Sequence, residues 1–135
     1  MTVTLPEMTR FLLSLDSAVD TVFEAVTKGK RGQTFVPKVP AANIVDLAKA
    51  IMGDKEIPIT YTGIRPGEKI HEIMVSEEEA HHCARRGDYF AILPMLPELR
   101  RDAAKANALK GEFSSAESLL SLAKTESLLK KHGLL

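Results

Sequence analysis

The chain has 135 residues, about the size of one ordinary domain and long enough to bury a core. Apolar residues make up 44% and charged residues 27%, close to the averages of soluble globular proteins, which excludes a disordered tail. Lys and Arg total 18, as do Asp and Glu, so no net charge draws the chain to nucleic acid or an anionic membrane. We therefore expect neither nucleic acid nor membrane among its partners.

Apolar runs and cysteine content indicate the compartment. No run approaches the ~20 apolar residues that span a bilayer, and the first residues lack the basic start and apolar stretch of a signal peptide. Cys83 is the only cysteine and cannot form an internal disulfide, which fits a reducing environment. These features favour a cytoplasmic location.

The first regular element expected is an amphipathic helix from Ser14 to Lys28. Ser14 or Asp16 is placed to cap it, and Gly29 follows its end. Its apolar positions repeat at helical spacing, at Ala18, Val19, Val22, Phe23 and Val26.

The middle of the chain alternates strand, helix and strand signals. Residues Gly32–Pro37 and Ile57–Thr62 have strand character, and Asn43 caps a helix between them that Gly53 ends. Two strands joined by a helix of this length are most easily parallel neighbours with a right-handed crossover. The expected fold class is therefore α/β: a small parallel βαβ sheet with flanking helices, and a ligand at the strand ends.

The last third is expected to contain further helices. Ser76 and Glu79 have capping-box spacing and predict a helix to about Arg86, followed by a strand over Asp88–Leu93. Residues 94–111 show neither period cleanly and are a possible linker, and 112–135 predict C-terminal helices with Ser114 or Ser115 as a cap. We expect residues 1–135 to form a single domain.

The densest motif is Gly63–Lys69, directly after the second expected strand. Pro66 fixes its own φ and Gly67 permits a positive one, so the pair predicts a tight turn with Arg65 and Glu68 on either side. Arginine matches phosphate oxygens and a carboxylate can accept from sugar hydroxyls, so this turn could grip a nucleotide. From the spacing alone, a surface salt bridge beside a turn is an equal alternative.

Other candidate sites are weaker. His81, His82 and Cys83 are consecutive on an expected helix, so their side chains diverge by roughly 100° and cannot close on one metal. His71 and Glu72 are adjacent and have no nucleophile nearby. Arg10, taken alone, is most simply a solvated charge. We expect no metal site.

Four ordered segments carry a family resemblance: Thr4–Phe11, Thr34–Pro40, Gly63–Glu72 and Gly87–Pro94. Together they are similar to motifs in the C-terminal part of the polysaccharide-biosynthesis dehydratases, extended short-chain dehydrogenase/reductases that act on UDP-N-acetylglucosamine. Residues Gly111–Ser115 and the leucine-rich end also look like that family's terminus.

The resemblance implies a binding role for three residues. Arg10 and Arg65 would contact the diphosphate of a UDP-sugar, and Glu68 would contact its ribose. Lys38 and Lys69 would lie beside the site without being direct ligands. In a full-length family member the reaction would be oxidation at sugar C4, loss of water across C5 and C6, and return of the hydride, with NADP or NAD as cofactor.

The catalytic parts of such an enzyme are not visible in this sequence. There is no Gly-rich dinucleotide fingerprint, and neither tyrosine begins a Tyr-x-x-x-Lys pair, because Arg65 follows Tyr61 and Leu93 follows Tyr89 at that spacing. We therefore expect no catalytic and no cofactor-binding residues here; a Rossmann half supplied in trans is one open source of them. Two alternatives remain open: part of a UDP-glucose 4-epimerase-type enzyme, and a non-enzymatic module that self-associates as a homo-oligomer.

Overall fold

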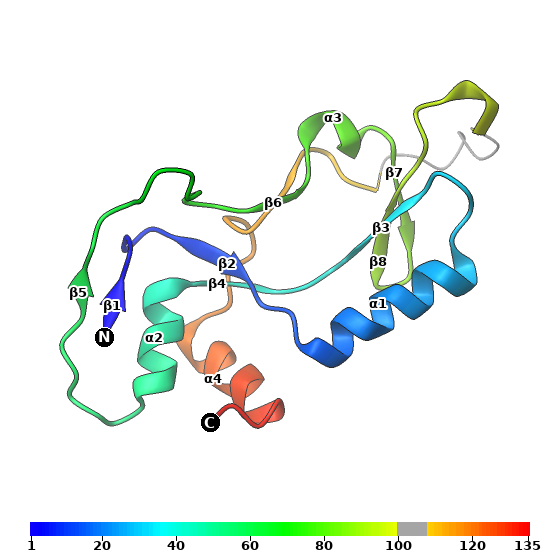
Figure 1. Cartoon of the computed structure of the whole chain (residues 1–135). Coiled ribbons are helices and arrows are strands. Elements are labelled where there is room, and N and C mark those ends of the chain that lie inside the picture. The colour runs from blue at the N-terminus through cyan, green and yellow to red at the C-terminus, as the bar shows by residue number, and fades with distance from the viewer. Residues whose placement is uncertain (100–107) are drawn as a thin grey trace. The chain divides into compact units, whose positions relative to one another are not determined.

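The computed structural model describes residues 1–99 and 108–135, and these form two compact units (Figure 1). Unit 1 comprises Met1–Leu12, Pro40–Glu72 and Ser115–Leu135. Unit 2 comprises Leu13–Val39 and Ile73–Ser114. Both units combine helices with short strands, so the described residues have the mixed α/β composition that the sequence predicts.

Two short strand pairs form the sheet structure of unit 1. Strand β1 (Thr2–Val3) pairs in parallel with β5 (Thr60–Tyr61). Strand β2 (Thr9–Phe11) pairs antiparallel with β4 (Ala41–Asn43), which places Arg10 opposite Ala42. An isolated parallel bridge joins Ala41 to Leu119. These pairs fix Arg10 at the centre of a strand whose neighbour leads directly into a helix.

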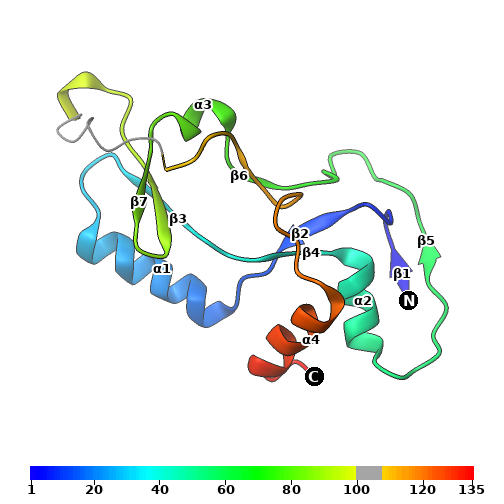
Figure 2. The same ribbon diagram turned by 180° about the vertical axis from the view of Figure 1, so that it is seen from behind.

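Helices α2 (Ile44–Met52) and α4 (Leu122–Lys131) complete unit 1 and pack side by side (Figures 1 and 2). The side chain of Asn43 caps α2 by accepting from Val45 N at 2.7 Å, as the sequence predicts. The buried residues of these two helices are small or apolar: Ala48, Ala50, Thr125 and Leu129.

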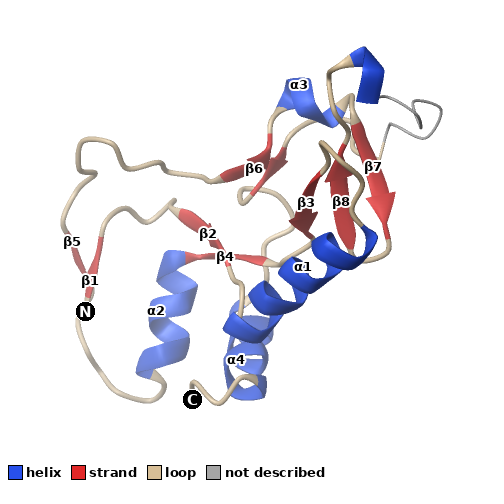
Figure 3. Cartoon of the chain, turned by 45° about the vertical axis from the view of Figure 1, so that its right-hand side comes forward, coloured by secondary structure: helices blue, strands red, loops and turns tan. Residues whose placement is uncertain are grey.

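Unit 2 is built on a three-stranded antiparallel sheet in the order β3–β8–β7 (Figure 3). The strands are β3 (Thr34–Pro37), β8 (Tyr89–Ile92) and β7 (Cys83–Arg86), and a second pair joins β6 (Ile73–Val75) to β9 (Phe113–Ser114). Their core contains Val36, Val75, Ala80, Cys83 and Phe90. Phe113 meets the Phe90 ring edge-on, with centroids 5.3 Å apart.

The remaining helices of unit 2 begin where the sequence predicts. Ser14 caps α1 (Leu15–Lys28), and its side chain accepts from Ser17 N at 3.2 Å. Helix α3 (Glu77–Ala80) has a complete capping box, because Ser76 Oγ accepts from Glu79 N and Glu79 Oε2 accepts from Ser76 N. A 3₁₀ turn spans Pro97–Leu99.

The predicted parallel βαβ unit is wrong. Strand β3 pairs antiparallel with β8, and β5 pairs with β1. The two strands expected to pair with each other, β3 and β5, therefore belong to different sheets. The register explains the outcome: Thr34–Pro37 align with Tyr89–Ile92, and both strands place apolar side chains in the same core. Only Thr60 and Tyr61 of the expected Ile57–Thr62 run form a strand.

The predicted extension of the third helix to Arg86 is also wrong. Helix α3 ends at Ala80, and Cys83–Arg86 pair with β8 as one arm of a hairpin. Gly87, with φ of 59°, makes the tight reversal to Tyr89, and the buried Cys83 and Ala84 suit a strand facing the core.

The C-terminal region contains one helix and one strand in the part that the structure describes. Phe113 and Ser114 form β9, and α4 is capped at Ser121 instead of at Ser114 or Ser115. Of the possible linker over 94–111, residues 100–107 lie outside the described residues. Among the described helices, none combines the length and the apolar character needed to cross a bilayer.

Candidate functional site

The turn at Arg65–Glu68 lies in unit 1 and has the geometry that its sequence predicts. Glu68 N donates to Arg65 O at 3.1 Å, which closes a four-residue turn. Pro66 occupies the second position and Gly67 the third, with a φ of 85°. Proline followed by a residue with positive φ is the signature of a type II turn. The turn therefore needs glycine at position 67.

The Glu68 side chain also fixes this turn. Its Oε2 accepts from the backbone N of Arg65 at 3.0 Å, so backbone and side chain of Glu68 both bond to Arg65. The guanidinium of Arg65 makes no hydrogen bond or ion pair with another residue that the structure describes, and Arg65 is exposed. Arg65 thus presents a free planar donor fork, whereas one carboxylate oxygen of Glu68 is already in use.

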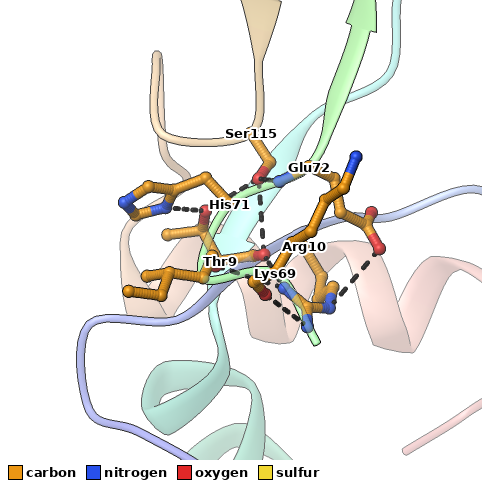
Figure 4. Close-up of polar contacts among 7 residues, drawn as sticks. Thr9, Arg10, Lys69, His71, Glu72 and Ser115 are labelled. Carbon is orange, nitrogen blue, oxygen red and sulfur yellow. Dashed lines mark hydrogen bonds and ion pairs between the residues drawn. The ribbon is translucent and has the colours of Figure 1, made fainter. Parts of the chain in front are cut away.

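Arg10 extends from the centre of β2 onto the chain that follows the turn (Figure 4). Its Nη1 donates to Thr9 O at 2.7 Å and to Ile70 O at 3.2 Å, and its Nη2 donates to Lys69 O at 3.0 Å. Its Nε lies 3.5 Å from Oε1 of Glu72. Arg10 therefore joins β2 to residues 69–72 through three carbonyls and one carboxylate.

The donors of Arg10 limit what it can offer a ligand. A guanidinium has five N–H donors in a fixed fork. Three N–H groups are directed at carbonyls and a fourth faces Glu72, which leaves one Nη2 N–H without a partner among the described residues. In this arrangement Arg10 can give a phosphate oxygen one hydrogen bond, and Glu72 offsets part of its charge.

Chain geometry keeps Arg65 close to the segment that Arg10 holds. A β-turn brings its first and fourth Cα atoms within about 7 Å. The next Cα is about 3.8 Å further on, so the Cα atoms of Arg65 and Lys69 lie within about 11 Å of each other. Arg10, Arg65 and Glu68 all belong to unit 1. No hydrogen bond or ion pair links Arg10 to Arg65 or to Glu68 in the described part of the chain.

A chain of hydrogen bonds through buried hydroxyl groups also links β2 to residues 71 and 72. Ser115 Oγ accepts from Glu72 N at 2.8 Å and lies 2.8 Å from Thr9 Oγ1, which in turn lies 2.8 Å from His71 Nδ1 (Figure 4). Thr9 and Ser115 are 2% and 0% exposed. Buried hydroxyls are costly unless hydrogen-bonded, so each member of this chain depends on the others.

No pattern in the sequence indicates this chain of hydroxyl groups. Thr9 and Ser115 are 106 positions apart, and neither belongs to a motif with chemical meaning by spacing. His71 and Glu72, set aside as an acid/base pair, face different partners: His71 bonds to Thr9, and Glu72 faces Arg10. In an extended segment, the side chains of adjacent residues point to opposite sides, which explains the different partners.

The two lysines expected beside the site, Lys38 and Lys69, have different surroundings. Lys69 contributes its backbone carbonyl to Arg10 in unit 1. Lys38 lies in unit 2, where its Nζ is 4.9 Å from the centroid of the Phe90 ring. The structure therefore gives Lys38 a cation–π contact within its own unit.

The described residues contain no group of three or more His, Cys, Asp or Glu side chains that could hold a metal ion. Cys83 is buried in β7, and its burial, with a smaller contribution from Glu79, raises the pKa of its thiol to about 11. A thiol in this environment stays protonated and is a poor metal ligand or nucleophile.

The described residues do not fit a dinucleotide cofactor. Such a site needs a parallel sheet and a Gly-rich turn that opens a helix. The one parallel strand pair described, β1–β5, has two residues per strand, and each α-helix is preceded by Ser14, Asn43, Ser76 or Ser121 instead of a Gly-rich turn.

Comparison with protein-family models gives a match over residues 1–94 to the family described as polysaccharide biosynthesis protein. The chain belongs to this family. The matched range contains Arg10, the Arg65–Glu68 turn and every strand from β1 to β8. Its membership relates it to the nucleotide-sugar epimerases and dehydratases of polysaccharide biosynthesis, through the relatives that follow.

Two curated relatives and one solved structure resemble this member of the polysaccharide biosynthesis protein family. A UDP-glucose 4-epimerase from Rickettsia bellii is 44% identical over 94 residues, which cover 68% of this chain and 28% of the relative. A UDP-N-acetylglucosamine 4,6-dehydratase (inverting) from Campylobacter jejuni is 38% identical over 95 residues, 70% of this chain and 28% of the relative. The X-ray structure of Pen from Bacillus thuringiensis matches all of this chain and 42% of that one, with a TM-score of 0.86 and 28% identity.

Proposed function

We propose that unit 1 binds the nucleotide part of a UDP-sugar and that the chain is the substrate-binding portion of a nucleotide-sugar 4,6-dehydratase of polysaccharide biosynthesis. Arg65 and Arg10 contact the diphosphate and Glu68 contacts the ribose. The observation that carries this proposal is the type II turn, which presents Arg65 beside a carboxylate within a family-matched segment; among the described residues the Arg65 guanidinium has no partner.

Charge and hydrogen bonding favour an anion at this turn. The Arg65 fork can bond two phosphate oxygens at once, and Arg10 adds one further N–H. Glu68 keeps one carboxylate oxygen without a hydrogen bond to a described residue, which is the acceptor that a ribose hydroxyl needs. The turn therefore offers a donor for phosphate and an acceptor for a ribose hydroxyl, the two groups that a nucleoside diphosphate presents.

The chain covers 28% of the length of the curated relatives that it matches, so the activity of a whole enzyme is part of the proposal. Hydride transfer would need NADP or NAD held by a Rossmann half supplied from outside these residues. Without such a half the chain is not catalytic, and it loses the sugar and cofactor contacts. We therefore expect a weak complex, with a Kd on the order of 1 mM.

A UDP-glucose 4-epimerase is the second candidate. The Rickettsia bellii protein of that name is more identical to this chain than the Campylobacter jejuni dehydratase is, at 44% against 38%. The turn and Arg10 recognise the part of the ligand that both enzymes' named substrates share, the UDP group. The two candidates can be separated by measuring how well UDP-glucose and UDP-N-acetylglucosamine each displace bound UDP. The sugar that binds more tightly indicates the matching enzyme.

The test is an NMR titration of the chain with UDP, using two arginine variants of equal charge. Arg65→Gln should weaken binding about tenfold or more, because a charge-assisted contact to phosphate is lost. Arg31→Gln removes an exposed arginine from unit 2 and should leave the affinity unchanged. Shifts should centre on residues 65–69. Absence of shifts at 10 mM UDP, or equal affinity of the two variants, would refute the proposed site.

A further inference from the structure

Ser115 joins the C-terminal part of unit 1 to the segment that follows the Arg65–Glu68 turn (Figure 4). It is 0% exposed, and its side chain and its backbone both bond to Glu72. Glu72 N donates to Ser115 Oγ at 2.8 Å, and Ser115 N donates to Glu72 O at 2.8 Å. Ser115 therefore holds both hydrogen-bonding groups of the Glu72 backbone.

The same hydroxyl group also reaches strand β2. Ser115 Oγ lies 2.8 Å from Thr9 Oγ1 and donates to Thr9 O at 3.3 Å. Thr9 O is the carbonyl that accepts from Arg10 Nη1 at 2.7 Å. Ser115 thus contacts a carbonyl that fixes Arg10, and it holds the backbone of Glu72, whose carboxylate faces Arg10.

The residues after Ser115 extend this contact to the neighbouring strand. Leu120 N donates to Ala41 O at 2.8 Å, and the isolated parallel bridge joins Ala41 to Leu119. Ala41 belongs to β4, the strand that pairs with β2. Residues 115–120 therefore bond to β2, to its partner strand and to the segment after the turn.

The placement of Arg10 depends on that segment at three points. Its guanidinium donates to the carbonyls of Lys69 and Ile70 and lies beside the carboxylate of Glu72. The side chain is 25% exposed, so it is within reach of solvent and of a ligand. A donor that is already fixed binds a ligand without the entropic cost of ordering a flexible side chain. Residues 69–72 must therefore stay in place for Arg10 to be ready for a phosphate oxygen.

We infer that Ser115 is a positioning residue of the UDP site, which holds Glu72 and β2 so that the remaining donor of Arg10 is fixed for the diphosphate. The inference rests on the proposed function of unit 1. Ser115 is fully buried, so it acts through Glu72 and Thr9 and does not touch the ligand. It lies beyond residues 1–94, the range that matches the family model, and so adds a residue from outside that range to the site.

The first test compares two buried hydroxyl groups of unit 1 in the NMR titration with UDP. Ser115→Ala removes the bond to Glu72 N and should weaken UDP binding about threefold to tenfold, because Arg10 must then be ordered on binding. Thr125→Val is the matched control: this hydroxyl belongs to a residue that is also 0% exposed in unit 1, but it bonds to Ser121 O at 3.1 Å, within α4 and its cap. The control should leave the affinity unchanged. Urea unfolding of both variants checks that stability falls in each, so that a difference in affinity reports positioning.

The second test asks whether the hydroxyl contact itself is required. Thr9→Val removes the hydroxyl that bonds to Ser115 and His71 at nearly constant volume, and it should weaken UDP binding as Ser115→Ala does. Thr9→Ser keeps this hydroxyl and should retain the wild-type affinity. An equal loss of affinity in both variants would show that packing at Thr9 matters and would overturn the role of the hydroxyl contact.

The third measurement reports on Arg10 without any ligand. The NMR signal of its Nε–H group, assigned by its loss in Arg10→Gln, should exchange faster with water in Ser115→Ala than in the wild-type chain or in Thr125→Val. If UDP binds and Ser115→Ala keeps the wild-type affinity, the positioning role is wrong and the proposed function stands. If UDP causes no shifts in the wild-type chain, the proposed function is wrong, and an unchanged Arg10 signal in Ser115→Ala would then refute the positioning of Arg10 as well.

Discussion

The Nη2 atom of Arg10 donates to the backbone carbonyl of Lys69 at 3.0 Å, and so holds the residue that directly follows the Arg65–Glu68 turn. With Nη1 bonded to Thr9 O and Ile70 O, this side chain ties β2 to a segment 59 and 60 positions further along the chain. In the absence of ligand, Arg10 thus has a structural function. Its proposed contact with a diphosphate would add one donor to that function.

Replacing Arg10 should therefore reduce stability as well as affinity. Arg10→Gln removes three hydrogen bonds from a charged donor, some of them exposed, and we expect the free energy of unfolding to fall by about 1–3 kcal/mol. Glu72→Gln breaks only the half-exposed ion pair and should cost less than about 1 kcal/mol. Urea denaturation of both variants measures the difference. Equal losses would show that the ion pair, and not the carbonyl contacts, holds the segment.

The buried hydroxyl chain should behave as a coupled unit. Ser115→Ala leaves Glu72 N and Thr9 Oγ1 each with one partner fewer in a buried setting, so we expect a loss of about 1–3 kcal/mol. Thr9→Val removes the other hydroxyl at nearly constant volume. Because both changes break the same bond, the double variant should lose less than the sum of the single losses. Additive losses in thermal or urea unfolding would contradict the coupling.

Local sequence signals predicted the starts of α1, α2 and α3, but not that of α4. Ser14, Asn43 and Ser76 each accept the backbone bond that their position before an apolar-periodic segment indicates. The Pro66–Gly67 turn was predicted equally well, because proline fixes its own φ and glycine permits the positive φ that the turn needs. These predictions succeeded because their causes lie within a few residues of the feature.

The pairing of strands that are distant in the sequence could not be inferred from the sequence. Cys83–Arg86 continue a helical pattern locally, but pairing with Tyr89–Ile92 and burial of Cys83 favour a strand. The same limit applies to the site: Ser115 reaches Thr9 only because unit 1 brings the chain back from residue 115. Patterns along a chain report local propensity, whereas these contacts depend on which elements meet.

Gly67→Ala tests whether the turn conformation is needed for binding. A methyl group at position 67 would meet no atom within 4 Å, so the expected penalty of about 1–2 kcal/mol comes from the positive φ alone. If the turn relaxes to avoid this strain, Arg65 and Glu68 separate and UDP affinity falls with stability. Gly111→Ala is the matched control, because its surroundings are equally open and its φ is not positive. Its unfolding free energy should change by less than about 0.5 kcal/mol.

Cys83 should make the stability of unit 2 depend on alkaline pH. Burial raises the pKa of its thiol from 9.0 to about 11, so above pH 9 the unfolded chain loses this proton while the folded chain keeps it. Ionisation stabilises the unfolded state, and the free energy of unfolding should fall between about pH 9 and pH 11 by on the order of 2 kcal/mol. Below pH 9 both states are protonated and the contribution is constant.

Other groups also titrate in that range, so the thiol contribution is isolated by comparison with Cys83→Ala. Lys and Tyr residues are the same in both proteins, and their effects cancel in the difference between the two unfolding curves. The wild-type chain should lose more stability than Cys83→Ala between pH 8 and pH 11, with no difference in slope below pH 8. Parallel pH profiles would mean that the folded protein admits solvent to the thiol, and that the core around Val75 and Phe90 opens more readily than its burial indicates.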